Sequence, residues 1–142
     1  MRRIGVYSRA MWLAVSISLL VGCSAADVFS PEGKQELRMK EQTQGMLEEI
    51  LASGKPEGFE KIVVSDKVAE RFPLGTSETV VVGAFKDLKG VSIYDDTPDT
   101  LLIRYDRGMA MFDVDPRTIL ITFTFDGAGS LIAVRAVHIK NQ

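Results

Sequence analysis

Apolar residues near the start of the domain recur at the spacing of an α-helix. Within residues 31–54, Leu47, Ile50 and Leu51 lie three or four positions apart, which places them on one helical face. Gly54 has the residue type that most often follows the last turn of a helix. The pattern therefore predicts a helix over most of this segment, more strongly in its second half, since two glycines interrupt the first half.

Two shorter helices are predicted next. Residues 65–72 open with Ser65, a favoured N-cap residue, and stop at Pro73, which cannot continue a helix. Residues 76–89 contain a strand-like V-V-V run, but Thr76 is a good N-cap and the apolar positions follow the helical period. The helical interpretation is therefore preferred for this second segment as well.

After Gly90 the apolar period changes from about 3.6 to 2, the period of a β-strand. A D-G-A-G loop joins the last two alternating segments, which predicts an antiparallel hairpin. The segment M-A-M-F-D-V at 109–114 is interpreted as extended chain that breaks at Asp115. The alternating segments are 91–94, 100–107, 117–126 and 130–140.

Helices come first along the chain and strands follow, which predicts an α+β fold. We expect two or three N-terminal helices packed on one face of a three- to four-stranded antiparallel β-meander. Residues 31–142 would form this single domain, with a partly helical lead-in at 31–64 and the core at 65–142.

The beginning of the chain has the layout of a targeting signal. Three arginines lie in the first nine residues and an apolar run follows at 11–21. This run is too short for a membrane span, which needs roughly 20 apolar residues, but it suits a secretory signal. We predict that residues 1–22 are a signal peptide, removed between Gly22 and Cys23.

Cys23, the only cysteine, directly follows the apolar run in the stretch L-V-G-C-S. This stretch resembles a bacterial lipobox, in which the cysteine sulfur receives a diacylglyceryl group. A free cysteine is often a core residue, but a core residue has no reason to stand at this junction. The resemblance implies a lipid such as palmitate on Cys23 and a tether at 23–30. Ser24 in place of aspartate implies outer-membrane sorting, with the domain on the periplasmic face, rather than inner-membrane retention.

Charge narrows the class of partner. Residues 1–22 contain three of the 17 basic residues and none of the 19 acidic ones, so cleavage raises the acidic excess from two to five. A net acidic surface argues against nucleic acid and against anionic lipid as partners. With Cys23 lipidated, no disulfide is available to stabilise the domain.

No catalytic or metal-binding constellation can be recognised. The one histidine, His138, lies near the end of the last strand and is expected at the surface or at the sheet edge. There is no second histidine or free cysteine for zinc, and no serine in a G-x-S-x-G motif. Asp95, Asp96 and Asp99 are interpreted as a solvated turn, since they lack the spacing of a calcium loop. We predict a non-enzymatic protein without metal, cofactor or small-molecule substrate.

Several stretches together resemble the SmpA/OmlA family of small outer-membrane lipoproteins, which includes the E subunit of the β-barrel assembly machinery. They are the lipobox at Cys23, L-G-T-S-E-T-V-V-V-G-A-F-K-D-L, I-R-Y at 103–105 and the hairpin I-T-F-T-F-D-G-A-G-S-L-I-A-V. Ile103 stands where that family usually has tryptophan, and the charged lead-in at 31–64 is not typical of it. The resemblance covers roughly residues 65–139 and implies a two-helix, three-strand fold with a role in envelope assembly.

Two functional hypotheses stay open. The first is a lipid-anchored interaction or assembly module that supports other envelope proteins through protein contacts. The second is an inhibitor or immunity-type lipoprotein that blocks a periplasmic enzyme. A small α+β domain can serve either role, so the fold does not choose between them.

Overall fold

The computed structural model describes residues 31–109 and 111–140. The predicted signal peptide, the Gly22–Cys23 cleavage site and the tether lie outside the described residues. No helix within the described part of the chain is both long and apolar enough to cross a membrane.

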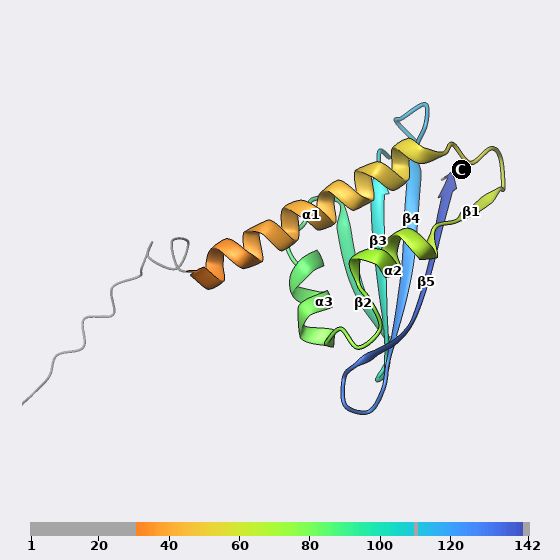
Figure 1. Cartoon of the computed structure of the whole chain (residues 1–142). Helices are drawn as coiled ribbons and strands as arrows, with labels where there is room; N and C mark the ends of the chain where they lie inside the picture. The colour runs from red at the N-terminus through yellow and green to blue at the C-terminus, as the bar shows by residue number, and fades with distance from the viewer. Residues whose placement is uncertain (1–30, 110, 141–142) are drawn as a thin grey trace, which may run out of the picture.

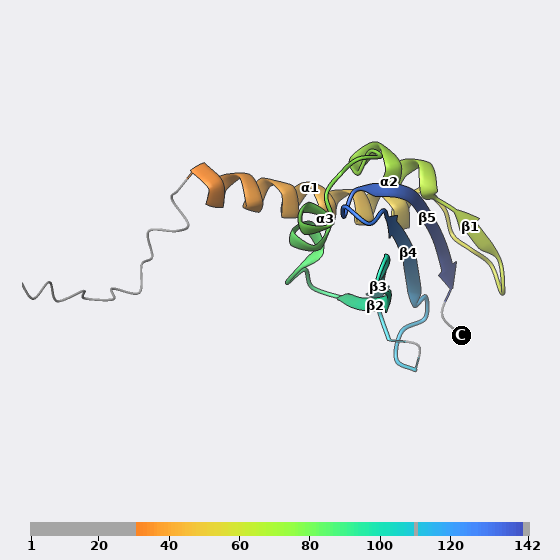
Figure 2. The ribbon, with the colours of Figure 1, turned by 90° about the horizontal axis from the view of Figure 1, so that it is seen from below.

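Helices cover one face of an antiparallel sheet (Figures 1 and 2). The sheet has five strands in the order β1-β5-β4-β3-β2, and every neighbouring pair is antiparallel. The predicted α+β fold is therefore confirmed, with one strand more than expected. The elements are α1 (Pro31–Ser53), β1 (Lys61–Val63), α2 (Ser65–Arg71), α3 (Glu78–Phe85), β2 (Val91–Thr97), β3 (Thr100–Arg107), β4 (Arg117–Phe125) and β5 (Leu131–Lys140).

The additional strand is β1, which lies in the predicted lead-in. It pairs with the end of β5, with Ile62 opposite His138 and Val63 opposite Val137. Three residues are too few to display a period of two, so the pattern gave no signal for this strand. Its presence makes β5 an internal strand of the sheet.

Alternate residues of the strands and the inward faces of the helices form a single core. Ile119, Ile121 and Phe123 of β4 are fully buried, as their alternation predicts. Phe72, Phe85 and Phe123 meet at the centre, with ring centroids 5.4 to 5.8 Å apart. The aromatic cluster thus joins α3 and the chain after α2 to the middle of the sheet.

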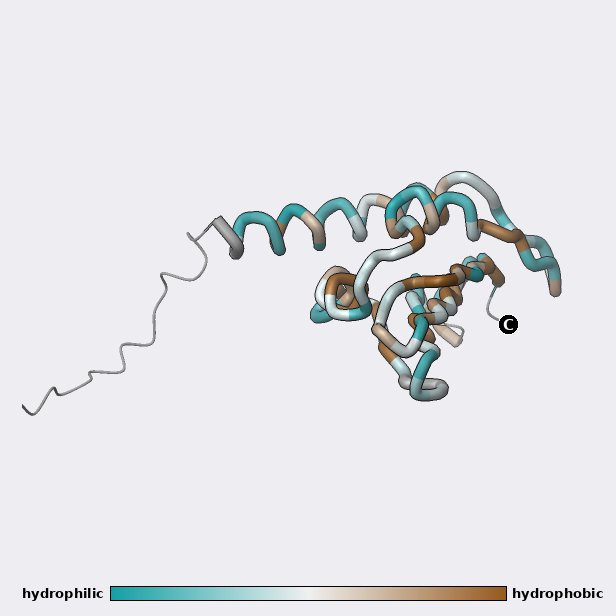
Figure 3. The backbone as a smooth tube through the Cα atoms, turned by 60° about the horizontal axis from the view of Figure 1, so that its bottom comes forward, coloured by the Kyte–Doolittle hydropathy of each residue, from teal (hydrophilic) through white to brown (hydrophobic). Residues whose placement is uncertain are grey.

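Helix α1 is continuous across Gly45 and buries Leu47, Ile50 and Leu51, as predicted. Its first half extends beyond the sheet and is largely hydrophilic (Figure 3). Gly54 directly follows the last helical residue, as predicted, but it lacks the positive φ that a glycine at this position often adopts. The last carbonyl groups of α1 instead accept hydrogen bonds from an arginine of β4, described below.

The two predicted N-caps, Ser65 and Thr76, need correction. Ser65 does not cap α2: its Oγ accepts a hydrogen bond from the Ala136 amide at 2.9 Å, which ties α2 to β5. Ser77, not Thr76, caps α3 and accepts from the Val80 amide at 3.4 Å. The helical interpretation of this segment is nevertheless confirmed, although α3 is shorter than predicted.

Candidate binding site

The connection between β3 and β4, residues 108–116, is a loop at the same end of the sheet as the C-terminus of α1 (Figure 1). The prediction of extended chain at 109–114 is therefore wrong. The amides of Phe112 and Asp113 both donate to the Met109 carbonyl at 2.9 Å, which closes a turn. The Asp113 carboxylate accepts from the Met109 amide and so fixes the same turn from its side chain.

Two features of position 108, where the loop begins, require a glycine. Its φ of +80° lies in the left-handed region, which side chains strain. A Cβ at this position would also lie only 2.8 Å from the Asp113 carboxylate. The glycine therefore permits both the turn and the close approach of Asp113.

The loop presents apolar side chains to solvent. Phe112 is 79% exposed and Val114 is 99% exposed. Single exposed apolar residues are common, whereas several of them in one short loop form an exposed apolar patch, the kind of surface to which partner proteins bind. We call this set the apolar loop: Met109, Met111, Phe112 and Val114.

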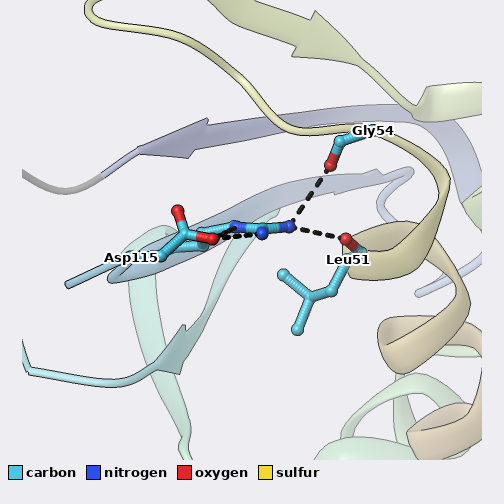
Figure 4. Close-up of polar contacts among 4 residues, drawn as sticks. Leu51, Gly54 and Asp115 are labelled. Atoms are coloured by element: carbon cyan, nitrogen blue, oxygen red, sulfur yellow. Dashed lines mark hydrogen bonds and ion pairs between the residues drawn. The ribbon is translucent and has the colours of Figure 1, made fainter. Parts of the chain in front are cut away.

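Arg117 joins β4 to the end of α1. It is only 6% exposed, and its Nη1 donates to the Leu51 carbonyl at 2.7 Å and to the Gly54 carbonyl at 3.4 Å (Figure 4). Its Nε donates to Asp115 at 3.0 Å, and Nη2 contacts the same carboxylate. A cation at this position satisfies the free carbonyl groups of the helix and complements the negative end of its dipole.

A cleft of about 510 Å³ opens between the end of α1 and the apolar loop. We call it the basic cleft, because three cations line it. Hydrogen bonding from Arg117 holds the pKa of Asp115 below its usual value, and the charges of Lys55 and Lys140 lower that pKa further. The lining residues are Leu51, Ala52, Lys55, Arg107, Gly108, Asp113, Val114, Asp115 and Arg117.

The charges of the cleft do not all have partners. Asp115 is engaged by Arg117, and Asp113 accepts from the loop backbone. Lys55 and Arg107 are exposed, and within the described residues neither side chain forms an ion pair or a hydrogen bond. The cleft therefore has two positive groups available for a ligand.

Sequence reasoning missed this cleft because its residues come from three separate segments. Lys55 follows α1, Arg107 ends β3 and Arg117 begins β4. The sequence does contain one signal for the loop. Apolar and polar residues do not alternate in the run M-A-M-F, which argues against a strand there.

The structure corrects the expectation for His138. The side chain is fully buried, because β1 covers the edge of β5 and because the alternation puts it on the helix-covered face with Ala136. Across the sheet it lies between Ile62 and Ile119. Neither ring nitrogen has a hydrogen-bond partner among the described residues. Burial lowers the pKa of His138, the Arg117 charge lowers it further, and Asp115 opposes the shift.

The lowered pKa of His138 predicts a loss of stability in mild acid. Above about pH 6.5 the ring is neutral in both the folded and unfolded states, so the stability is complete. As the pH falls below that value, the unfolded state binds a proton first, and the free energy of unfolding drops by up to about 1.4 kcal/mol per pH unit. Below the folded-state pKa this loss levels off.

His138→Leu is expected to abolish this loss of stability in mild acid. At neutral pH the stability of the variant should equal or exceed that of the original protein, because both ring nitrogens lack partners among the described residues. Urea unfolding at pH 7.5 and at pH 5.5 measures both quantities. An equal fall in stability for the two proteins between these pH values would refute the assignment.

The prediction of a single turn that contains all three acidic residues is wrong, because they divide between a strand and a turn. Asp95 and Asp96 belong to β2, and Asp99 lies in the turn before β3. Among the described side chains, histidine, cysteine, aspartate and glutamate form no group of three or more that could hold a metal ion.

Residues 47–142 match the model of a family of unknown function (DUF6393). The matched region contains every residue that lines the basic cleft, and it excludes the projecting first half of α1. No curated protein and no solved structure matches the chain. Because the match covers more than half of the sequence, the chain belongs to this family of unknown function, DUF6393.

Proposed function

We propose that the protein is a lipid-anchored, periplasmic interaction or assembly module of the bacterial envelope that binds another protein and performs no catalysis. The observation that carries the proposal is the apolar loop beside the basic cleft. Its exposed side chains offer apolar area for a partner, and the cleft adds charged groups that give orientation. The resemblance to SmpA/OmlA lipoproteins supports the same class of function.

The position of the site suits a tethered protein. Helix α1 has 23 residues and is therefore about 34 Å long at 1.5 Å per residue. The proposed anchor at Cys23 precedes α1 in the sequence, whereas the cleft residues Leu51 and Ala52 lie in the last turn of α1. In this arrangement α1 acts as a spacer that carries the site away from the tether.

Inhibition of a periplasmic enzyme is the second candidate. Phe112 and Val114 extend from a short loop whose turn is fixed by Asp113, and such a loop is suited to insertion into a concave site. One soluble enzyme as the sole tight partner would favour this function over assembly.

Cys23→Ser tests the anchor. Because the thiolate is the lipid acceptor in the proposal, we expect labelled palmitate to be incorporated by the original protein in its host and not by this variant. Ser24→Ala is the matched control and should remain labelled. Fractionation of the labelled protein should place it in the outer membrane. Labelling that persists in Cys23→Ser would contradict the proposed lipidation.

A further inference from the structure

We propose that the basic cleft binds a peptide of the partner protein that carries a carboxylate next to an apolar side chain. This inference rests on the proposed function and names the chemistry of the partner. The carboxylate would lie between Lys55 and Arg107, and its apolar neighbour would contact the apolar loop.

Charge is the first argument for this ligand. Lys55 and Arg107 line one cleft, and among the described residues their side chains form no ion pair or hydrogen bond, whereas Asp113 and Asp115 are already engaged. A carboxylate of the ligand would therefore pair with two positive side chains without displacing an existing ion pair. Hydrogen bonds between such ionised groups are about twice as strong as neutral ones.

The preformed walls of the cleft are the second argument. Arg117 is held on one side by two carbonyl groups of the α1 terminus and on the other by Asp115. Asp113 fixes the part of the lining that belongs to the loop, through the Met109 amide. A site whose walls are already ordered loses little conformational entropy when it binds a ligand.

The lining carries three positive and two negative side chains, so its net charge matches that of one carboxylate in size and is opposite in sign. A phosphate group carries up to two negative charges and would leave the occupied cleft with an excess of negative charge, whereas a single carboxylate balances it. The acidic excess of the mature chain likewise opposes approach to an anionic lipid surface. A carboxylate on a peptide is therefore favoured over a phosphate or a lipid headgroup.

The position of Val114 is the third argument, because this residue belongs both to the basic cleft and to the apolar loop. It lines the basic cleft and is 99% exposed, so it connects the charged site to the apolar loop. A ligand with its carboxylate in the cleft would place an adjacent side chain over Val114. This contact would remove apolar area from water on both partners.

The probe for the test is the peptide acetyl-alanyl-alanyl-phenylalanine with a free carboxylate, compared with the same peptide as its C-terminal amide. Both are titrated into the full chain purified in detergent, and binding is measured by isothermal titration calorimetry. We expect saturable binding of the carboxylate form and at least tenfold weaker binding of the amide.

Two variants locate the binding. Lys55→Gln and Arg107→Gln should each weaken the carboxylate peptide about three- to tenfold, the range expected when one charge-assisted contact is lost. Lys89→Gln, which replaces an exposed lysine outside the cleft, should bind as the original protein does. Since both cleft residues are exposed, the variants should fold, and thermal unfolding checks this.

Three outcomes would overturn the inference. They are no saturable binding of the carboxylate peptide, equal binding of the amide, and binding that both cleft variants leave unchanged. Tighter binding of inorganic phosphate, or of phosphatidylethanolamine–phosphatidylglycerol vesicles that depends on Lys55, would assign the cleft to phosphate instead. A partner captured at the apolar loop despite such a failure would leave the proposed function standing and reject only this ligand.

Discussion

Phe123→Ala is expected to reduce the free energy of unfolding by about 3–5 kcal/mol, the usual cost of deleting a buried aromatic ring. Phe123 is fully buried on β4, and its ring lies 5.5 Å from Phe72 and 5.8 Å from Phe85 between centroids. The deletion would leave a cavity where α3 and the chain after α2 meet the sheet. Since domains of this size have about 5–15 kcal/mol of stability, the loss is a large fraction of the total.

Ile132→Ala is the matched control for this prediction. Ile132 lies on β5 but is 53% exposed, so its truncation should change the free energy of unfolding by about 0.5 kcal/mol or less. Denaturant unfolding of both variants, followed by circular dichroism, gives the comparison. A similar small loss for both would show that the aromatic cluster does not organise the core.

Arg117→Met is expected to cost about 2–4 kcal/mol, the second-largest effect. Methionine preserves much of the apolar stem but removes the donors to the Leu51 and Gly54 carbonyls. The buried Leu51 carbonyl left without this donor costs about 1–3 kcal/mol, the longer contact to the half-buried Gly54 carbonyl adds less, and Asp115 loses its counter-ion as well. Equilibrium unfolding measures the loss, and amide hydrogen exchange should show faster opening of the last turn of α1.

Arg107→Met provides the comparison, because Arg107 is exposed and without an ion pair among the described residues. It should remain within about 0.5 kcal/mol of the original protein. In some proteins apolar residues replace a buried ion pair without any loss of stability. If Arg117→Met had the same stability as the original protein, or a higher one, this side chain would not hold α1 to the sheet.

The fold was predictable from the sequence where long segments carry a clear period. Phe123 and its neighbours on β4 alternate over nine residues, and the apolar stripe of α1 follows the helical spacing. The choice of helix for α3 was correct because spacing and end signals outweighed the local preference of three valines. In each case many residues supported the same interpretation.

The remaining features depend on tertiary contacts that a local pattern does not contain. His138 is buried because β1 pairs beyond β5, and β1 is too short to be recognised. The Leu51 carbonyl in the last turn of α1 accepts a hydrogen bond from Arg117, which is 66 residues away in the chain. The basic cleft has the same origin, because Lys55 and Arg107 become neighbours of one cavity only after the sheet has formed.

The most direct test of the central claim places a photoreactive benzoylphenylalanine at Phe112 in the full-length protein in living host cells. The matched control carries the same residue at Tyr94, which is 50% exposed on β2, away from the apolar loop. Illumination should give a discrete adduct with another envelope protein from position 112 and none from position 94. No adduct from position 112, or the same adducts from both positions, would contradict the account of the apolar loop and basic cleft as the partner-binding surface.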